Sequence, residues 1–143
     1  MDHKIFWKKK KNLALALMTV CVIASALLLC YHRFRPRPEA GKKDIVVDVV
    51  YEDASADSYA VTTDAQYLEQ ALADIPGLAI EGSRTDQFGL MILTINGVTA
   101  DYGKDQAYWA LELDGRPCDY GVSMQPIGDN DHYRLVYTKA GDL

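Results

Sequence analysis

The first long pattern in the chain is an uninterrupted apolar segment. The eighteen residues that begin at Leu13 include no charged side chain, and only Thr19 and Ser25 carry hydroxyls. As a helix, a segment of this length spans roughly 27 Å, close to the thickness of a bilayer hydrocarbon core. The pattern predicts a transmembrane anchor over residues 13–31, preceded by a basic tail of residues 1–12.

Two other interpretations of this segment are open. Lys8 to Lys11 form a positive n-region, and Ala24-Ser25-Ala26 fits the cleavage pattern of a removable signal peptide. The second alternative is a lipid attached to Cys30. We favour the uncleaved anchor, because cleavage after Ala26 leaves an apolar run that starts at Leu27 as the new N-terminus.

Charge alone does not orient the helix. Five lysines precede it and five Lys or Arg residues follow it, all within residues 33–43. Because the tail before the helix is short and tightly basic, we expect it in the cytoplasm. The prediction is a single-pass protein of the plasma membrane whose C-terminal part lies outside the cytoplasm.

The segment after the anchor is basic and contains two prolines. Residues 32–43 include Pro36 and Pro38, which favour extended chain over regular helix. We expect a stiff stalk here, followed by a folded domain over residues 44–143.

The beginning of the domain has the alternation of a strand. Residues 44–51 are rich in β-branched side chains, and Ile45, Val47 and Val49 fall on one face. A turn and a short partner strand over residues 58–62 follow. The remaining strand candidates are residues 78–81, 88–95, 108–113 and 132–138.

One helix is expected between these strands. Thr63 and Gln66 have the spacing of a capping box, with Thr63 as the N-cap. Apolar side chains then recur at helical spacing until Pro76-Gly77 ends the pattern. The apolar positions are Leu68, Ala71, Leu72 and Ile75.

The element order predicts the fold class. Residues 88–95 are apolar on both parities, which is typical of a central strand covered on both faces. A hairpin, one helix and further strands indicate an α+β domain: a β-grasp-like mixed sheet with one packed helix. The transmembrane helix precedes it.

Charge and cysteine content narrow the function. Residues 1–38 carry a net charge of +7 and residues 39–143 one of −12, which argues against nucleic acid as a partner of the domain. Cys118 is the only cysteine of the domain, so it is either a free thiol or an intermolecular link.

Signatures of catalysis and of metal binding are absent. Of the three histidines, His3 and His32 flank the apolar helix and only His132 belongs to the domain. Residues 129–131 begin like a calcium loop but lack its glycine and distal glutamate, so a turn explains them better. We expect neither catalytic residues nor metal ligands.

Aromatic side chains concentrate in the C-terminal half. Alternation directs three of them, Trp109, Tyr133 and Tyr137, towards the core. The others are more exposed and able to contact a flat ligand: Tyr102, Tyr108 and Tyr120.

Several short motifs in this half occur in a known order and spacing. They are Ile95-Asn96-Gly97, Tyr108-Trp109, Asp114-Gly115, Gly121-Val122 and Pro126-Ile127. Over about Ile45 to Thr138, the sequence resembles the transcobalamin-like C-terminal domain of Gram-positive surface proteins.

The resemblance implies a ligand and a partner. In transcobalamin and intrinsic factor, the related small β domain closes over cobalamin held by a helical barrel, which this chain lacks. A similar role implies a small-molecule ligand, a corrinoid such as cobalamin, with no cofactor required and with a helical-repeat protein or vitamin transporter component completing the site. With the exposed tyrosines, the family motifs give the expected ligand-facing residues: Asn96, Tyr102, Tyr108, Trp109, Tyr120, Gly121 and Val122.

A second hypothesis uses the same fold without a ligand. A sheet edge or an aromatic patch of the domain would then bind another protein at the cell surface. The turn sequences Asn96-Gly97 and Asp114-Gly115 also have a purely structural explanation, since both tolerate positive φ. An enzyme is the least favoured hypothesis.

Overall fold

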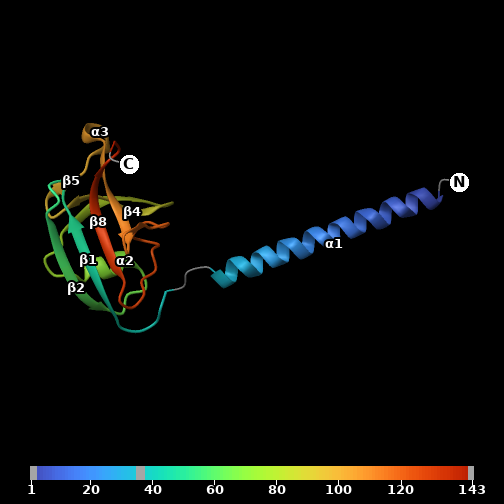
Figure 1. The fold of residues 1–143 in the computed structure, drawn as a ribbon, viewed down its shortest axis with the longest axis horizontal. Helices are drawn as coiled ribbons and strands as arrows, with labels where there is room; N and C mark the ends of the chain where they lie inside the picture. The colour runs from blue at the N-terminus through green and yellow to red at the C-terminus, as the bar shows by residue number, and fades with distance from the viewer. Residues whose placement is uncertain (1–2, 35–37, 142–143) are drawn as a thin grey trace. The chain divides into compact units, whose positions relative to one another are not determined.

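The computed structural model describes residues 3–34 and 38–141, which form a helical unit and a C-terminal domain (Figure 1). Helix α1 (His3–Phe34) contains an apolar stretch, Asn12–Phe34, long enough to be a membrane span or a signal sequence. The helix includes His32 to Phe34, where the sequence predicted an extended stalk. Pro36, the first stalk proline, lies outside the described residues.

The hydroxyls of Thr19 and Ser25 in the apolar stretch are satisfied within α1. Thr19 Oγ1 donates to the Leu15 carbonyl at 2.9 Å, and Ser25 Oγ donates to the Cys21 carbonyl at 2.7 Å. Neither group therefore needs a polar partner outside the helix. This arrangement is compatible with a hydrocarbon environment.

The larger sheet of the domain has five strands in the order β2-β1-β8-β6-β7. They are β1 (Lys43–Val50), β2 (Ala56–Thr63), β6 (Ala107–Leu113), β7 (Arg116–Pro117) and β8 (His132–Lys139). β1 and β8 pair in parallel and the other pairs are antiparallel, so the sheet is mixed.

The predicted alternation of β1 is confirmed. Ile45, Val47 and Val49 are buried, whereas the intervening residues from Asp44 to Val50 are more exposed. β2 runs antiparallel to β1 in register from Lys43 opposite Thr63 to Val50 opposite Ala56. The predicted hairpin is therefore present.

A second, three-stranded sheet in the order β3-β4-β5 departs from the single sheet that the sequence predicted. Its strands are β3 (Ile80–Thr85), β4 (Gly89–Ile95) and β5 (Val98–Thr99). β4 is central, as expected, but the prediction that both its faces are covered is wrong: Met91 and Leu93 are exposed. The apolar run reflects an open face rather than a second buried one.

Helix α2 (Leu68–Ala73) begins later than the capping box predicted. Thr63 is instead the last residue of β2, and its hydroxyl accepts a hydrogen bond from the Ala65 N–H at 3.1 Å. The first N–H groups of α2 bond to a distant loop: Leu68 to the Gln125 carbonyl and Glu69 to the Val122 carbonyl, each at 2.9 Å. Tertiary contacts thus replace the expected side-chain cap.

The core joins α2 to the inner faces of both sheets. Leu68 of α2, Ile95 of β4, and Tyr133 and Leu135 of β8 are almost completely buried. The remaining short helix, α3 (Tyr102–Asp105), lies between β5 and β6 and contributes no buried residue. As predicted, one helix supplies the apolar face against which the sheet residues pack.

Candidate functional site

Asn96 lies in the turn between β4 and β5. Its φ of 49° and that of Gly97, 83°, are both positive, as an Asn-Gly hairpin turn requires. The Asn96 Nδ2 donates to the hydroxyls of Tyr51 and Tyr59, each at 2.9 Å, and its Oδ1 accepts from the Ala79 N–H at 3.0 Å. The amide therefore links the turn of the small sheet to β2 and the end of β1.

Trp109 is packed beside the same tyrosine. Its side chain is 8% exposed, and its indole N–H donates to the Leu93 carbonyl at 3.2 Å. The ring makes edge contacts with Tyr51 and Tyr137, at centroid distances of 6.1 and 5.5 Å. The predicted inward orientation of Trp109 is confirmed, and Tyr51 brings it into one cluster with Asn96.

Gly121 and Val122 belong to the loop between β7 and β8. The Gly121 carbonyl accepts from the N–H groups of Met124 and Gln125, at 3.0 and 2.9 Å. Val122 is 3% exposed, and Tyr120 beside them is 39% exposed. Tyr120 and Met124, which is 53% exposed, are thus the large side chains that this part of the loop presents to solvent.

Ser123 connects this loop to β4. Its Oγ accepts from the Leu90 N–H at 2.8 Å and donates to the Glu69 carboxylate, which also pairs with Arg84. The Ser123 hydrogen bond, assisted by Arg84, holds the pKa of Glu69 below its usual value. Loop, helix α2 and the β3–β4 hairpin are thereby joined through one carboxylate.

The large apolar side chains exposed in the described domain belong to β4, to the segments on either side of it in the sequence and to the loop before β8. Phe88, at 69% exposure, immediately precedes β4, and Met91, at 56%, lies within it. A side-chain carbon added at Gly121 would contact the Phe88 carbonyl. At the other end of β4, the Ala100 N–H donates to the Leu93 carbonyl at 2.8 Å. We call the set of exposed side chains the β4 patch: Phe88, Met91, Leu93, Val98, Tyr102, Tyr120 and Met124.

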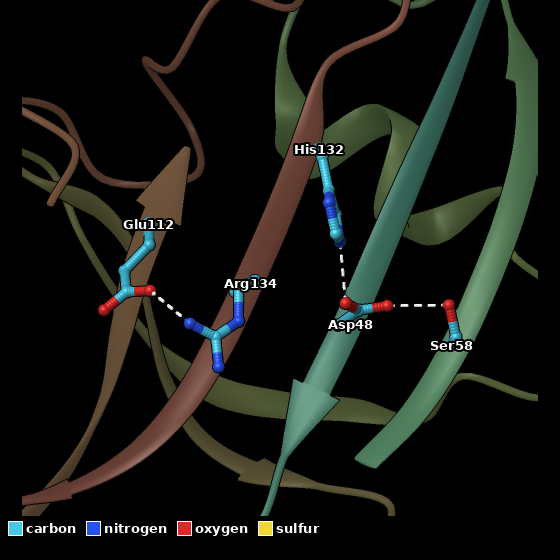
Figure 2. A network of polar contacts seen from close by, with 5 residues as sticks. All are labelled: Asp48, Ser58, Glu112, His132 and Arg134. Carbon is cyan, nitrogen blue, oxygen red and sulfur yellow. Dashed lines mark hydrogen bonds and ion pairs between the residues drawn. The ribbon is translucent and has the colours of Figure 1, made fainter. Parts of the chain in front are cut away.

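The outer face of the five-stranded sheet carries polar side chains that pair with one another, unlike the apolar side chains of the β4 patch. Figure 2 shows Asp48 of β1 receiving hydrogen bonds from Ser58 on β2, at 2.6 Å, and His132 on β8, also at 2.6 Å. Arg134 pairs with Glu112 of β6 at 3.0 Å. Polar pairs thus connect four neighbouring strands.

The electrostatics of Asp48 follow from these contacts. Burial raises its pKa, but the hydrogen bonds from Ser58 and His132 and the nearby charge of Arg134 outweigh burial, so the pKa lies below its ordinary value. Ser58 and His132 both bond to Asp48 rather than to each other. The group therefore lacks the serine–histidine contact of a catalytic triad.

Tyr108 shares this outer face. It lies opposite Thr138 in the β6–β8 pair, on the same parity as Glu112 and on the opposite parity from Trp109. The structure therefore separates the predicted ligand residues. Asn96 and Trp109 lie between the sheets, Gly121 and Val122 lie in the loop, and Tyr108 lies on the outer face. Tyr102 is exposed in α3 and Tyr120 is exposed in the loop before β8.

Two further sites have no evident ligand chemistry. Burial, with Asp119, Asp131 and Glu112 nearby, raises the pKa of the Cys118 thiol to about 11, so it is protonated at neutral pH. Asp129 Oδ1 accepts from the Asp44 N–H at 2.9 Å, which supports the predicted turn. Among the described residues, no group of three His, Cys, Asp or Glu side chains is placed to hold a metal.

Among the hollows on the described surface, three are lined by none of the seven predicted residues. They measure about 470, 280 and 200 Å³. The hollow of 200 Å³ is lined by Glu69, Leu72, Leu78 and Leu90, among others. The hollow of 470 Å³ is lined by Tyr51 and Glu52, among others, and by Val98 of the β4 patch. Two of the seven predicted residues, Tyr102 and Tyr120, are instead members of the β4 patch, and we take this patch as the candidate site.

Sequence reasoning missed most of this surface. Phe88, Met91 and Leu93 stand in the apolar run that was interpreted as a strand buried on both faces, and Met124 was not singled out. The signal was present in that run. A surplus of apolar residues on both parities does not by itself distinguish a buried second face from an exposed binding face.

Comparisons with known proteins were made by sequence and by structure. No family model matches the chain, and no curated protein matches it. A proposed metal-binding protein from Ruminococcus gnavus is similar in structure, with a TM-score of 0.60 and 26% identity over 68% of this chain and 98% of that protein. Haptocorrin in complex with Cbi (cobinamide) gives a TM-score of 0.54 at 16% identity over 73% of this chain.

The chain spans only 27% of the length of haptocorrin. At this identity the likeness concerns the fold, which is transcobalamin-like.

Proposed function

We propose that this chain is a membrane-anchored, extracytoplasmic domain that binds a small molecule of the corrinoid class. The observation that carries the proposal is the β4 patch, in which large apolar side chains such as Phe88 and Met91 are left open to solvent. Exposed apolar patches of this kind mark binding surfaces in soluble domains. The transcobalamin-like, β-grasp-like fold supports a corrinoid as the ligand.

The anchor in this proposal is helix α1. Its apolar stretch has the length of a span, and the hydroxyls of Thr19 and Ser25 are satisfied inside the helix. The basic tail of residues 1–12 is placed in the cytoplasm, and the acidic domain outside it.

A partner is part of the proposal because the β4 patch is open. Phe88 and Tyr120 are exposed, whereas good small-molecule sites bury most of the ligand. A helical-repeat protein or a vitamin transporter component is proposed to cover the other side of the ligand. The domain itself performs no covalent step.

Calorimetric titration with cobinamide and with cobalamin tests the proposal. The full chain is reconstituted in phosphatidylcholine vesicles, and empty vesicles serve as the control. Saturable binding in the micromolar range or tighter is the expected result. Absence of saturable heat for both corrinoids, with the domain shown to be folded by near-ultraviolet circular dichroism, contradicts the corrinoid assignment.

A second candidate is a surface module that binds protein through a sheet edge. It is favoured by one observation, the long regular edge strand β2 (Ala56–Thr63). Cobinamide binding is not expected to depend on that edge, since β2 contributes no residue to the β4 patch.

A further inference from the structure

The described part of the domain has four sheet edges, and they differ in how well they resist pairing with another strand. β5 and β7 have two residues each. β3 has six residues, is interrupted by a register shift between Glu81 and Gly82, and carries Arg84. β2 has eight residues and pairs with β1 without a shift along its whole length.

β2 lacks the features that commonly protect an edge strand. Between Ala56 and Thr63 there is no proline, no lysine or arginine and no bulge, and Asp57 is its single charged residue. A long, regular edge without these features is a template for strand addition.

The backbone groups that face the open edge can be identified from the pairing pattern. The Val46 N–H bonds to the Asp131 carbonyl at 3.0 Å, so the even-numbered residues of β1 are directed towards β8. The odd-numbered residues of β1 therefore bond to β2. It follows that four exposed residues of β2 present N–H and C=O groups to the edge: Ala56, Ser58, Ala60 and Thr62.

Two side chains of this edge strand are hydrogen-bonded to β1. Ser58 donates to Asp48 at 2.6 Å (Figure 2), and Thr62 donates to Asp44 at 2.5 Å. Each bond ties an edge residue to β1 across the sheet. The strand is thus ordered before any partner arrives, which lowers the entropic cost of pairing.

We propose that β2 pairs with β2 of a second copy of this chain, antiparallel and about a two-fold axis at Tyr59. In this register Ser58 lies opposite Ala60 of the partner subunit, and Ala56 lies opposite Thr62 of the partner subunit. All four edge residues then bond, and the two five-stranded sheets become one continuous sheet.

The sequence of β2 is self-complementary in this register. Asp57 faces Val61 of the partner subunit rather than a second carboxylate, so no like charges oppose each other. An isologous contact of this kind closes after two copies. Anchoring in one membrane, which rests on the proposed function, raises the effective concentration of the two edges.

Disulfide trapping tests the register. The native residues Cys21, Cys30 and Cys118 are replaced by alanine, and full chains carrying either Ser58→Cys or Ala60→Cys are reconstituted together in phosphatidylcholine vesicles. A directly paired couple has Cα atoms about 5.5 Å apart, within disulfide range. Cysteines at position 58 in both copies are roughly 8–9 Å apart, which is too far.

The expected result is rapid oxidation in the mixture of the two variants and slow oxidation of each variant alone. Equal rates in all three samples, faster oxidation in a single-variant sample, or no cross-link at all would overturn the proposal. Because Ser58→Cys removes a hydrogen bond to Asp48, circular dichroism confirms that each variant is folded.

A charge variant gives an independent readout. Ala60→Lys places a cation on the free edge, and Gln87→Lys adds the same charge in the exposed β3–β4 turn as the matched control. Sedimentation of the full chain in detergent measures the dissociation constant of the dimer. We expect this constant to rise about tenfold for Ala60→Lys and to stay unchanged for Gln87→Lys. Equal effects of the two variants would contradict an edge interface.

Failure of this proposal and failure of the proposed function can be told apart. The cross-linking experiment contains no corrinoid, and cobinamide titration of Ala60→Lys is expected to give the wild-type affinity because position 60 lies outside the β4 patch.

Discussion

Asn96 shows how one side chain can connect two sheets. Its amide donates hydrogen bonds to the hydroxyls of Tyr51 and Tyr59 and accepts one from the N–H of Ala79, so these contacts are all within the domain. The family motif suggested a ligand contact at this position. In the structure, the hydrogen-bonding capacity of the amide is largely used by the fold itself.

Replacement of Asn96 separates the amide from the backbone turn. Asn96→Gly keeps a residue that tolerates φ of 49° and loses the amide, at a cost of about 1–2 kcal/mol in the free energy of unfolding. Asn96→Ala adds backbone strain and costs about 2–3 kcal/mol. Urea unfolding of the full chain in detergent measures both, and wild-type stability of Asn96→Ala would show that the amide does not hold the sheets together.

The Asp48 carboxylate predicts a pH-dependent contribution to stability. Its pKa is lowered in the folded state, so its contribution is present above the unfolded pKa of about 3.9 and is lost as pH falls through the lower folded value. Asp48→Asn is expected to cost about 1 kcal/mol at pH 7, with the difference from wild type shrinking below about pH 4.

Unfolding curves from pH 3 to pH 7 measure this effect. Asp86→Asn, in the exposed β3–β4 turn, is the control and should track the wild type throughout. A constant difference between Asp48→Asn and wild type across the whole range would contradict an ionised Asp48 as the source.

At the level of elements, strands with strong local signals were predictable. The β-branched alternation of β1 and the aromatic alternation around Trp109 in β6 were both correct, because burial of one face imposes a period of two. Turn chemistry also placed Asn96-Gly97 correctly. These features depend on near neighbours in the sequence.

The start of helix α2 could not be predicted in the same way. Its first N–H groups bond to carbonyls of Val122 and Gln125, more than fifty residues away in the sequence. Thr63 resembles a cap locally, but pairing with Lys43 keeps it in β2. A local motif was overridden by contacts that form only in the folded chain.

Replacement of Ser123 tests whether its hydrogen bonds connect the loop before β8 to helix α2 and the β3–β4 hairpin. Ser123→Ala leaves the Leu90 N–H without its acceptor and removes the hydrogen bond that lowers the pKa of Glu69. We expect a loss of about 1–2 kcal/mol in the free energy of unfolding, and a rise in the pKa of Glu69. Urea unfolding measures this loss. The control variant Ser83→Ala, at an exposed position of β3, should change the free energy of unfolding by less than about 0.5 kcal/mol. Equal losses in the two variants would mean that Ser123 makes no special contribution to stability.

At the scale of the whole molecule, the α+β class and mixed sheet were predictable, but the division into two sheets was not. Which face of β4 is open depends on the packing of α2 and the 118–127 loop, and neither position is encoded in the local pattern of residues 88–95. For the same reason, the candidate site was only partly predictable. Tyr102 and Tyr120 lie on the β4 patch, whereas Tyr108 lies on the outer face of the other sheet.

The separation of Tyr108 from Tyr120 provides a matched pair of variants. Both are tyrosines with partly exposed side chains, and they lie on different surfaces. If the β4 patch binds the corrinoid, truncation of Tyr120 should weaken corrinoid binding, and truncation of Tyr108 should leave it unchanged. Neither substitution removes a hydrogen bond from the core clusters described above.

The most direct test of the account is therefore a cobinamide titration of three full chains in phosphatidylcholine vesicles: wild type, Tyr120→Ala and Tyr108→Ala. The account predicts saturable binding to wild type, affinity weaker by about tenfold or more for Tyr120→Ala, and wild-type affinity for Tyr108→Ala. Loss of affinity in Tyr108→Ala with Tyr120→Ala unchanged, or no binding to any of the three chains, would contradict the β4 patch as a corrinoid-binding surface.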